Sequence, residues 1–363
     1  MKVATGLATG TAPTSELAAK AVESAMLKAN IHAPSSVLLF LTSEFAADPQ
    51  SAIKAAAKAA SCTQIIGCSA TGIFTEEDWV LDSPAAAAMV FSGDVNLAVL
   101  GENSKTSPIL TLAAPNAINS TWLNKPGLRF GGVSGDATGH GPFSVWQNGK
   151  GATQGYCELV INHAQVAVAA SHGLKNISSP RKITKTKGHD VLSIGNIDAL
   201  SSLTSAWHKH HKSDKSLPYH QLIAMVANKA TQLERGEYNV ASIITGNEES
   251  ASVTLTKALQ EGDWLSWAIR DVDAAQIDIV KTASTLKQQL SAEPAFALLF
   301  SCLGRGPYFY NNTDQDLALL KTLFPNLPII GFYGNGEIAP IHGVNELLQY
   351  SAVLALCAHA PMP

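Results

Sequence analysis

Two glycine-bounded loops, "GCSATG" (67–72) and "GFYGNG" (331–336), contain the residues of this chain that are best suited to chemistry. The first loop has the glycine spacing of a phosphate-binding loop. However, Ile73 and Phe74 stand where a lysine and a hydroxyl residue would hold phosphate and magnesium. A serine nucleophile elbow needs the order G-x-S-x-G, and here the second glycine comes one residue too late. These departures argue against both a P-loop nucleotide site and a serine hydrolase.

The cysteines suggest an alternative, in which a thiol acts as the catalytic nucleophile. Cys68 lies in the first loop, and Cys302 precedes Arg305, whose charge would lower the pKa of a neighbouring thiol. The competing interpretation is that both cysteines are small buried hydrophobic residues. The chain has five cysteines and no CxxC pair, which predicts reduced thiols rather than disulfides or a zinc site.

Histidines cluster once, in "WHKHH" (207–211), where His208 and His211 would share a helix face. No glutamate stands at metalloprotease spacing, so a solvated helix end is the favoured interpretation. His172, in "SHG" directly after a predicted strand, is the histidine best placed to face a pocket.

Polar groups suited to a small zwitterion surround the second loop. Arg305 offers a fork for a carboxylate, and Glu337 would bind an ammonium group. The alternative is that Arg305 and Glu337 pair with each other and brace the two loops. The predicted ligand-binding residues are Ser69, Thr71, Ser301, Cys302, Arg305, Tyr308, Tyr310, Asn335 and Glu337.

The elements that must position these residues occur twice in the same order. Each set has a buried strand, a helix, a strand with its glycine loop, and a further strand. Gly67 and Gly72 match Gly331 and Gly336 at one offset, and Thr313 is the predicted N-cap of the second helix. The matching segments are 37–43 with 295–302, 49–61 with 313–325, and 85–91 with 351–357. We interpret this order as an internal duplication that forms a pseudo-symmetric pair of α/β units.

The predicted fold class is mixed α/β (α+β), because strands and helices alternate without a strict βαβ rhythm. Between and after the repeated segments we expect strands at 155–171, 238–245 and 263–271 and a helix at 273–290. The length of 363 residues favours two domains, predicted as 1–212 and 213–363. The polar stretch "KSDKSLPYH" (212–220) is the predicted linker.

The composition limits the classes of partner that we expect for this chain. A net charge of −4 without a basic stripe argues against nucleic acid, and the cationic stretch at 179–189 is interpreted as a solvated strand and loop. The apolar runs have strand length, well below the ~20 residues of a membrane helix. The first residues lack the apolar segment of a signal peptide. We therefore expect a cytoplasmic protein.

Four strings, "IIGCSATGIF", "FGGVSGD", "FSCLGRG" and "GFYGNGEIAP", resemble the signature segments of the FIST family, over about residues 1–357. The name abbreviates F-box and intracellular signal transduction proteins. The resemblance implies an intracellular sensory protein for amino acids or their derivatives. It also implies partners such as histidine kinases, cyclic-dinucleotide enzymes or chemotaxis receptors, here as separate chains. Ile73 departs from the glutamate that is usual in the first loop, whereas the second loop keeps it as Glu337.

Three hypotheses follow. The first is a non-enzymatic sensor without a cofactor, in which Ser69 and Thr71 face the same cavity as Asn335 and Glu337. The second, which comes from the family, is a haem-based nitric oxide sensor with His172 as the axial ligand. The third is a thiol enzyme that uses Cys68 or Cys302.

Overall fold

The structure is a computed structural model that describes residues 2–100, 108–211, 216–235 and 238–360. The chain forms two compact units: unit 1 contains residues up to 172 and from 276 onward, and unit 2 contains residues 173–275. Helices and mixed sheets confirm the predicted fold class. The predicted boundary at residues 212 and 213 lies outside the described residues. Among the described helices, none combines the length and apolar character needed to span a membrane.

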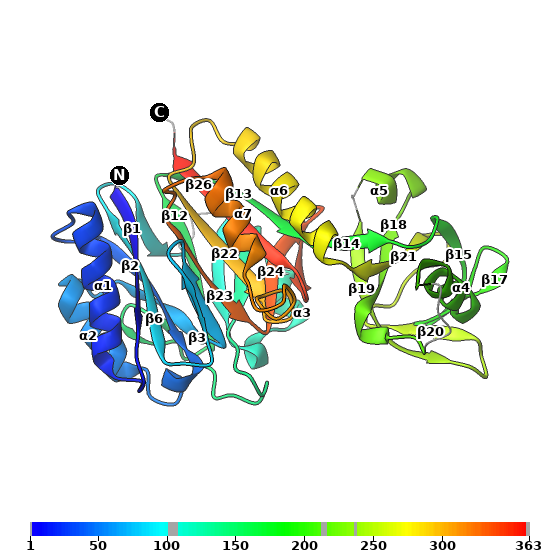
Figure 1. The fold of residues 1–363 in the computed structure, drawn as a ribbon, viewed down its shortest axis with the longest axis horizontal. Helices are drawn as coiled ribbons and strands as arrows, with labels where there is room; N and C mark the ends of the chain where they lie inside the picture. The colour runs from blue at the N-terminus through cyan, green and yellow to red at the C-terminus, as the bar shows by residue number, and fades with distance from the viewer. Residues whose placement is uncertain (1, 101–107, 212–215, 236–237, 361–363) are drawn as a thin grey trace. The chain divides into compact units, whose positions relative to one another are not determined.

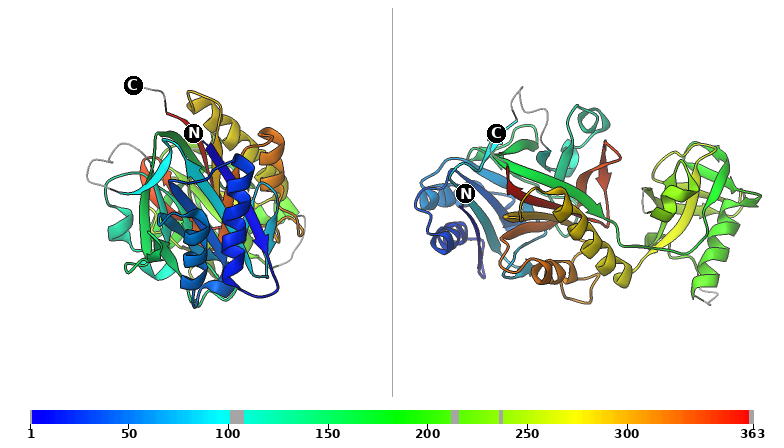
Figure 2. Two further views of the ribbon diagram at one scale, coloured as in Figure 1. Left: turned by 90° about the vertical axis from the view of Figure 1, so that its left-hand side faces the viewer. Right: turned by 90° about the horizontal axis from the view of Figure 1, so that it is seen from above.

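The first sheet of unit 1 contains most of "GCSATG": residues 67–70 lie in β3 (Ile65–Ala70), Gly72 begins β4 (Gly72–Thr75), and only Thr71 lies between the strands, so the predicted loop is shorter than expected. Helices α1 (Ser15–Ala29) and α2 (Gln50–Ala60) pack together against this sheet (Figures 1 and 2). The 3₁₀ helix η1 (Ser43–Phe45) follows β2. In spatial order the strands are β1 (Lys2–Thr9), β6 (Ala85–Ser92), β2 (Ser36–Thr42), β3 (Ile65–Ala70), β10 (Val145–Gln147) and β11 (Lys150–Gly151).

Another sheet contains most of "GFYGNG": residues 331–334 lie in β23 (Ile329–Gly334), Gly336 begins β24 (Gly336–Ile341), and only Asn335 lies between the strands. Helices α6 (Val272–Gln289) and α7 (Gln315–Leu323) pack on this sheet (Figure 1). The N-cap of α7 is Asp314, whose carboxylate accepts from Leu317 N, so the prediction of Thr313 was wrong by one position. The strands are β13 (Ala164–Ser171), β26 (Ala352–His359), β22 (Phe296–Cys302), β23 (Ile329–Gly334), β4 (Gly72–Thr75) and β5 (Trp79–Leu81).

A further sheet of unit 1 contains "FGGVSGD", which begins in strand β9. The short helices η2 (Pro115–Ala117) and α3 (Ser120–Leu123) connect β8 to β9. The strands are β25 (Val344–Leu348), β24 (Gly336–Ile341), β9 (Arg129–Val133), β8 (Ile109–Ala113), β12 (Tyr156–Asn162) and β7 (Asn96–Val99).

These three sheets share one pairing scheme. Each has a parallel pair, β2–β3, β8–β9 or β22–β23. The strand that follows each pair joins a different sheet: β4 pairs with β23, β24 with β9, and β10 with β3. This cyclic exchange ties the ends of β3, β9 and β23 together. The residue pattern predicts two of these segments and indicates only a strand end for the third; an evolutionary duplication stays a prediction.

One glycine in each parallel pair explains how closely the strands approach. A Cβ on Gly67 would lie 1.6 Å from Leu39 O, and one on Gly331 would lie 1.9 Å from Leu299 O. At Gly131 the corresponding atom would lie 1.8 Å from the carbonyl oxygen of its partner, Thr111. Any side chain at these positions would collide with the neighbouring strand, so the glycines are needed for packing.

The inner faces of the three sheets form a common hydrophobic core. The Phe40 and Phe332 rings meet edge to face at 4.9 Å between centroids, and Phe300 and Phe332 at 5.3 Å. Phe130 adds a ring from the sheet of β9, 6.5 Å from Phe300. Side chains from all three sheets therefore bury each other, which makes the strand ends above them a rigid platform.

Unit 2 is a separate sheet with its own core around Trp267. The strands expected at 238–245 and 263–271 are confirmed as β19 and β21. Its helices are α4 (Ala199–His211), η3 (Tyr219–Gln221) and α5 (Ala230–Arg235), and "WHKHH" ends α4. The strands are β14 (Leu174–Asn176), β15 (Arg181–Lys187), β16 (Asp190–Ile194), β17 (Ile197–Asp198), β18 (Leu222–Ala227), β19 (Asn239–Asn247), β20 (Ser252–Leu255) and β21 (Trp264–Arg270).

Candidate functional site

The ends of β3, β9 and β23 and the residues directly after them hydrogen-bond to one another. The hydroxyl oxygens of Ser69 and Ser134 lie 3.1 Å apart, and Ser134 Oγ donates to Ser69 O at 2.6 Å. Asn335 N donates to Val133 O at 3.1 Å, which joins the loop of β23 to the end of β9. Sequence reasoning missed Ser134, although "FGGVSGD" repeats the small and hydroxyl residues of "GCSATG".

Gly135 lies where side chains from two of these loops meet. A Cβ on Gly135 would lie 2.8 Å from Asn335 Oδ1 and 3.0 Å from Thr71 Oγ1. The side chains of Thr71 and Asn335 therefore border one point, although they are far apart in the sequence. Thr71 is buried and Asn335 is half-buried, so the junction extends toward solvent on the Asn335 side. A ligand-binding role for these residues stays a prediction.

Glu337 is completely buried on β24. Ser351 Oγ donates to its Oε2 at 2.7 Å, whereas Oε1 has no hydrogen-bond partner in the part of the chain that the structure describes. Burial raises the pKa of Glu337 well above its usual value, against the smaller lowering effects of Ser351 and Arg305. The matching residue of the first loop, Ile73, lies in the apolar core. Glu337 thus has one unsatisfied oxygen, and its raised pKa favours the protonated form.

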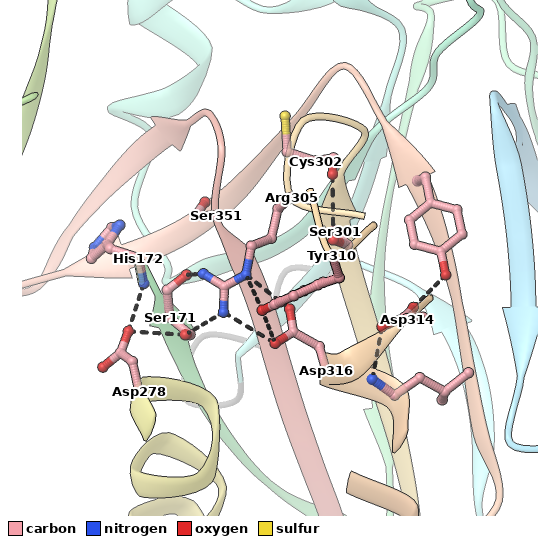
Figure 3. Close-up of polar contacts among 12 residues, drawn as sticks. Ser171, His172, Asp278, Ser301, Cys302, Arg305, Tyr310, Asp314, Asp316 and Ser351 are labelled. Carbon is pink, nitrogen blue, oxygen red and sulfur yellow. Dashed lines mark hydrogen bonds and ion pairs between the residues drawn. The ribbon is translucent and has the colours of Figure 1, made fainter. Parts of the chain in front are cut away.

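Arg305 is also buried, and it binds Asp316 (Figure 3). Its Nε and Nη2 donate to the two carboxylate oxygens of Asp316, at 2.9 and 3.1 Å, as a bidentate pair. Tyr310 OH donates to Asp316 Oδ1 at 2.7 Å and accepts from Arg305 Nε at 3.1 Å. Burial lowers the pKa of Arg305, but the charge of Asp316 outweighs it and the net pKa is raised. Glu337 receives no hydrogen bond from Arg305, so the expected direct pair of the two is wrong.

The Arg305 network extends to the end of β13. Arg305 Nη1 donates to Ser171 O at 3.3 Å, and Nη2 donates to Ser171 Oγ at 3.1 Å. Ser171 Oγ and His172 N both donate to Asp278 Oδ2 on α6, at 2.9 and 2.8 Å. Asp316 and Asp278 were not singled out in the sequence, because an acid on a helix is ordinary there. Only the fold brings Asp316 to Arg305 and Asp278 to Ser171.

A second buried acid, Asp314, lies beside this network. Tyr333 OH donates to its carboxylate. Burial and the nearby charge of Asp316 raise the pKa of Asp314 from 3.8 to about 6. The helix cap of α7 is therefore a titrating group.

Comparison with known proteins gives the family. The FIST N domain matches residues 35–197, and the FIST C domain matches residues 198–340. This chain belongs to the FIST family. FIST domains are associated with sensing in signal transduction.

Relatives of this FIST chain are distant. It is 23% identical over 336 residues to uncharacterized protein Rv0628c of Mycobacterium tuberculosis. This match covers 86% of the chain and 87% of the relative. Uncharacterized protein Mb0898c of Mycobacterium bovis is 24% identical over 228 residues, or 62% of this chain, and the match spans only 59% of that relative. F-box only protein 22 of Homo sapiens is 32% identical over 85 residues, or 21% of this chain and 20% of that protein.

The other predicted residues of the FIST chain lie in different surroundings. Tyr308 is exposed and donates to the carboxylate of Asp82, away from the buried network. Ser301 is buried, and its hydroxyl lies 3.4 Å from Cys302 O, which accepts from it. Cys68 is completely buried, which raises the pKa of its thiol well above the usual value. A raised pKa is the opposite of what a thiolate nucleophile requires.

The haem hypothesis depends on His172, whose imidazole points away from the guanidinium of Arg305 in Figure 3. The groups that hold this segment are Ser171, Asp278 and Arg305, which are polar or charged. These contacts involve the backbone N of His172 and the side chain of Ser171, so the haem hypothesis stays a prediction. No cluster of His, Cys, Asp and Glu with the arrangement of a metal site occurs among the described residues, His208 and His211 included.

Proposed function

We propose that this FIST protein is a sensor that binds a small amine at the junction of the three strand-end loops. The observation that carries the proposal is Glu337 Oε1, a buried oxygen on β24, and a second buried oxygen, Thr71 Oγ1, lies between β3 and β4. Neither has a hydrogen-bond partner within the described chain. Unsatisfied buried polar groups are rare in folded proteins, because each costs about 1–3 kcal/mol, so such groups are often completed by a ligand or ion.

The chemistry of Glu337 favours an amine as the ligand. A positive charge within reach would stabilise the carboxylate and lower its pKa, since opposite charges favour the ionised form. The ammonium group would then donate to Oε1 while Ser351 keeps Oε2. Asn335 offers an amide at the half-buried side of the same loops. The proton of Glu337 would leave when the ligand binds.

Arg305 has a different role in this proposal. Both of its carboxylate-binding nitrogens face Asp316, so a ligand carboxylate would have to displace a buried ion pair. We therefore assign Arg305 and Tyr310 to the frame that supports the loops. The proposed ligand class therefore changes from zwitterionic amino acids to molecules that bind mainly through their amino group.

The test is calorimetry and thermal unfolding with a panel of primary amines, amino acids and small carboxylates. An amine at ~100 times its Kd is expected to stabilise the parent by about 2.7 kcal/mol. Glu337→Gln removes the ionisable group at nearly constant volume and is expected to abolish that shift, and Thr71→Ala to weaken it. Tyr308→Phe, at the exposed tyrosine, is the matched control.

Proton release gives an independent readout. Calorimetry in two buffers of different ionisation enthalpy is expected to show release of protons with the parent and none with Glu337→Gln. An amine that stabilises Glu337→Gln as well as it stabilises the parent would show that the site is elsewhere. Signal output through a separate histidine kinase, cyclic-dinucleotide enzyme or chemotaxis receptor, in the cytoplasm, belongs to the same proposal.

A further inference from the structure

Unit 2 contains a hollow that the proposed amine site does not involve. It has a volume of about 670 Å³ and lies between the segment that precedes β15 and the outer face of α4. This is within the range of roughly 300–1,000 Å³ that is typical of small-molecule sites. Its lining is Asn176, Ile177, Ser178, Ser179, Pro180, Arg181, Ile197, Ser202, Ser205, Ala206, Lys209 and His210.

The charges around this hollow have one sign. Arg181 and Lys209 line it from opposite walls, His210 adds an imidazole, and the lining contains no carboxylate. Both Arg181 and Lys209 are exposed, and neither has an ion pair or side-chain hydrogen bond to any residue that the structure describes. Two cations that converge on a concave surface without a counter-charge create a positive potential there.

Neutral donors complete the lining. The hydroxyls of Ser179 and Ser205 are exposed, and within the described chain neither is used in a hydrogen bond. Together with the forked guanidinium of Arg181 and the ammonium of Lys209, they supply O–H and N–H donors on both walls. Donors without acceptors are the arrangement that binds an oxyanion.

The base of the hollow is rigid. Ser178 O accepts from Ser266 Oγ at 2.6 Å, and Ser178 Oγ accepts from Trp267 N at 2.7 Å. On the other wall, Trp267 Nε1 donates to Ser202 Oγ at 3.1 Å. The buried Trp267 thus holds both walls against one core, so little conformational freedom is lost when a ligand binds.

His210 lies in the lining and is close to charged residues outside it. Burial lowers the pKa of His210, and the neighbouring charges of His211 and Lys175 lower it further, with Asp271 opposing them. The side chain of Lys175 also lies 3.5 Å from Asp271 Oδ2, so that acid is already shared with a lysine.

From this geometry we propose that the hollow between β15 and α4 is a binding site for a small phosphate-bearing ligand, with Arg181 and Lys209 as its charged contacts. The tetrahedral phosphate group has several acceptor oxygens and at least one full negative charge, which matches two cations and flanking hydroxyls. The volume admits a group larger than inorganic phosphate alone.

The experiment is calorimetry on the full chain with inorganic phosphate, pyrophosphate, glycerol phosphate and citrate, at low and high salt. Pyrophosphate or the phosphate ester is expected to bind, and more weakly as salt rises. Arg181→Ala and Lys209→Ala are each expected to reduce the affinity by about tenfold or more, because each removes a hydrogen bond to a charged group. Lys187→Ala is the matched control, since it removes one exposed charge of the same strand outside the hollow.

Each result of this experiment either supports or overturns the phosphate site. Loss of phosphate-ester binding in the two variants and not in the control supports the site, and the relative affinities of inorganic phosphate and the ester identify the source of the phosphate group. Equal binding of citrate, equal loss in the Lys187→Ala control, or no binding of any phosphate compound would overturn the proposal. Circular dichroism of each variant confirms that it is folded. The amine proposal is unaffected by any of these results.

Discussion

Asp316 and Glu337 are two buried acids of unit 1 whose surroundings differ. Asp316 binds Arg305 through both carboxylate oxygens and also accepts from Tyr310. Glu337 has a single donor, Ser351, and one oxygen without a partner. A fully satisfied buried charge supports structure, whereas a buried acid with one oxygen left unsatisfied is costly to keep. The difference indicates that Asp316 maintains the loops and that Glu337 is the group available to a ligand.

The largest expected effect comes from breaking the satisfied pair. Arg305→Met leaves the carboxylate of Asp316 buried without its counter-charge and is expected to reduce the free energy of unfolding by about 3–5 kcal/mol. Urea unfolding followed by circular dichroism measures it. The double variant Arg305→Met with Asp316→Leu is expected to recover part of the loss. A single variant within about 1 kcal/mol of the parent would contradict the assignment of a structural pair.

The titration of Asp314 gives the next effect. Its folded pKa of about 6 exceeds the ordinary 3.8, so between these values the folded state keeps a proton that the unfolded state loses. The stabilisation that Asp314 contributes is therefore fully present below about pH 4, and it is lost as the pH rises through about 6. Asp314→Asn keeps an N-cap but removes the titration. Across this window its stability relative to the parent is expected to rise, by the order of 2 kcal/mol.

Thermal unfolding at several pH values tests the Asp314 prediction. Asp82→Asn, at an exposed turn outside the buried network, serves as the control for the loss of one carboxylate. Parallel pH curves for the parent and Asp314→Asn would show that Asp314 does not titrate as described.

The hydroxyl of Tyr310 contributes a smaller amount. Tyr310→Phe removes one of the donors to the buried Asp316 and is expected to cost about 1–3 kcal/mol. Tyr308→Phe removes an exposed hydroxyl of the same loop and is expected to change stability by less than about 0.5 kcal/mol. Equal effects of the two substitutions in urea unfolding would remove the distinction between a buried network and a surface contact.

The smallest effect on stability is expected at the half-satisfied acid. Glu337→Gln preserves an acceptor for Ser351 and is expected to cost no more than about 1 kcal/mol at acidic pH. Because the folded pKa of Glu337 is raised, the parent loses stability as pH rises above the unfolded pKa, so the variant should gain relative to it. A large loss at every pH would place Glu337 with the structural acids.

Much of the local structure was readable from residue patterns. The apolar runs at 37–43 and 295–302 became β2 and β22, and the helix at 273–290 became α6. Gly67 and Gly331 lie within β3 and β23, where only glycine fits against the carbonyl of the adjacent strand. The equivalent glycine of the third sheet, Gly131, was not recognised, because the residues next to it in the sequence differ from those next to Gly67 and Gly331.

The partners of the charged residues were not readable in the same way. Arg305 and Glu337 were natural partners by charge, yet Asp316 from the first turn of α7 takes the guanidinium. Ser134 was missed because its contact with Ser69 requires β10 to leave the sheet of β9 and join that of β3. An exchange of strands between sheets leaves no periodic pattern in the sequence from which it could be predicted.

The sequence by itself determined the family, the strands and helices of the repeated segments, and the placement of small polar residues at strand ends, since these depend on local pattern and on motif identity. The tertiary structure alone decided which loops meet, which acid Arg305 binds, and that Glu337 is left with an unsatisfied oxygen. The reason is physical: periodicity and glycine sterics act over a few residues, whereas strand exchange between sheets and the pairing of buried charges depend on residues brought together only by packing.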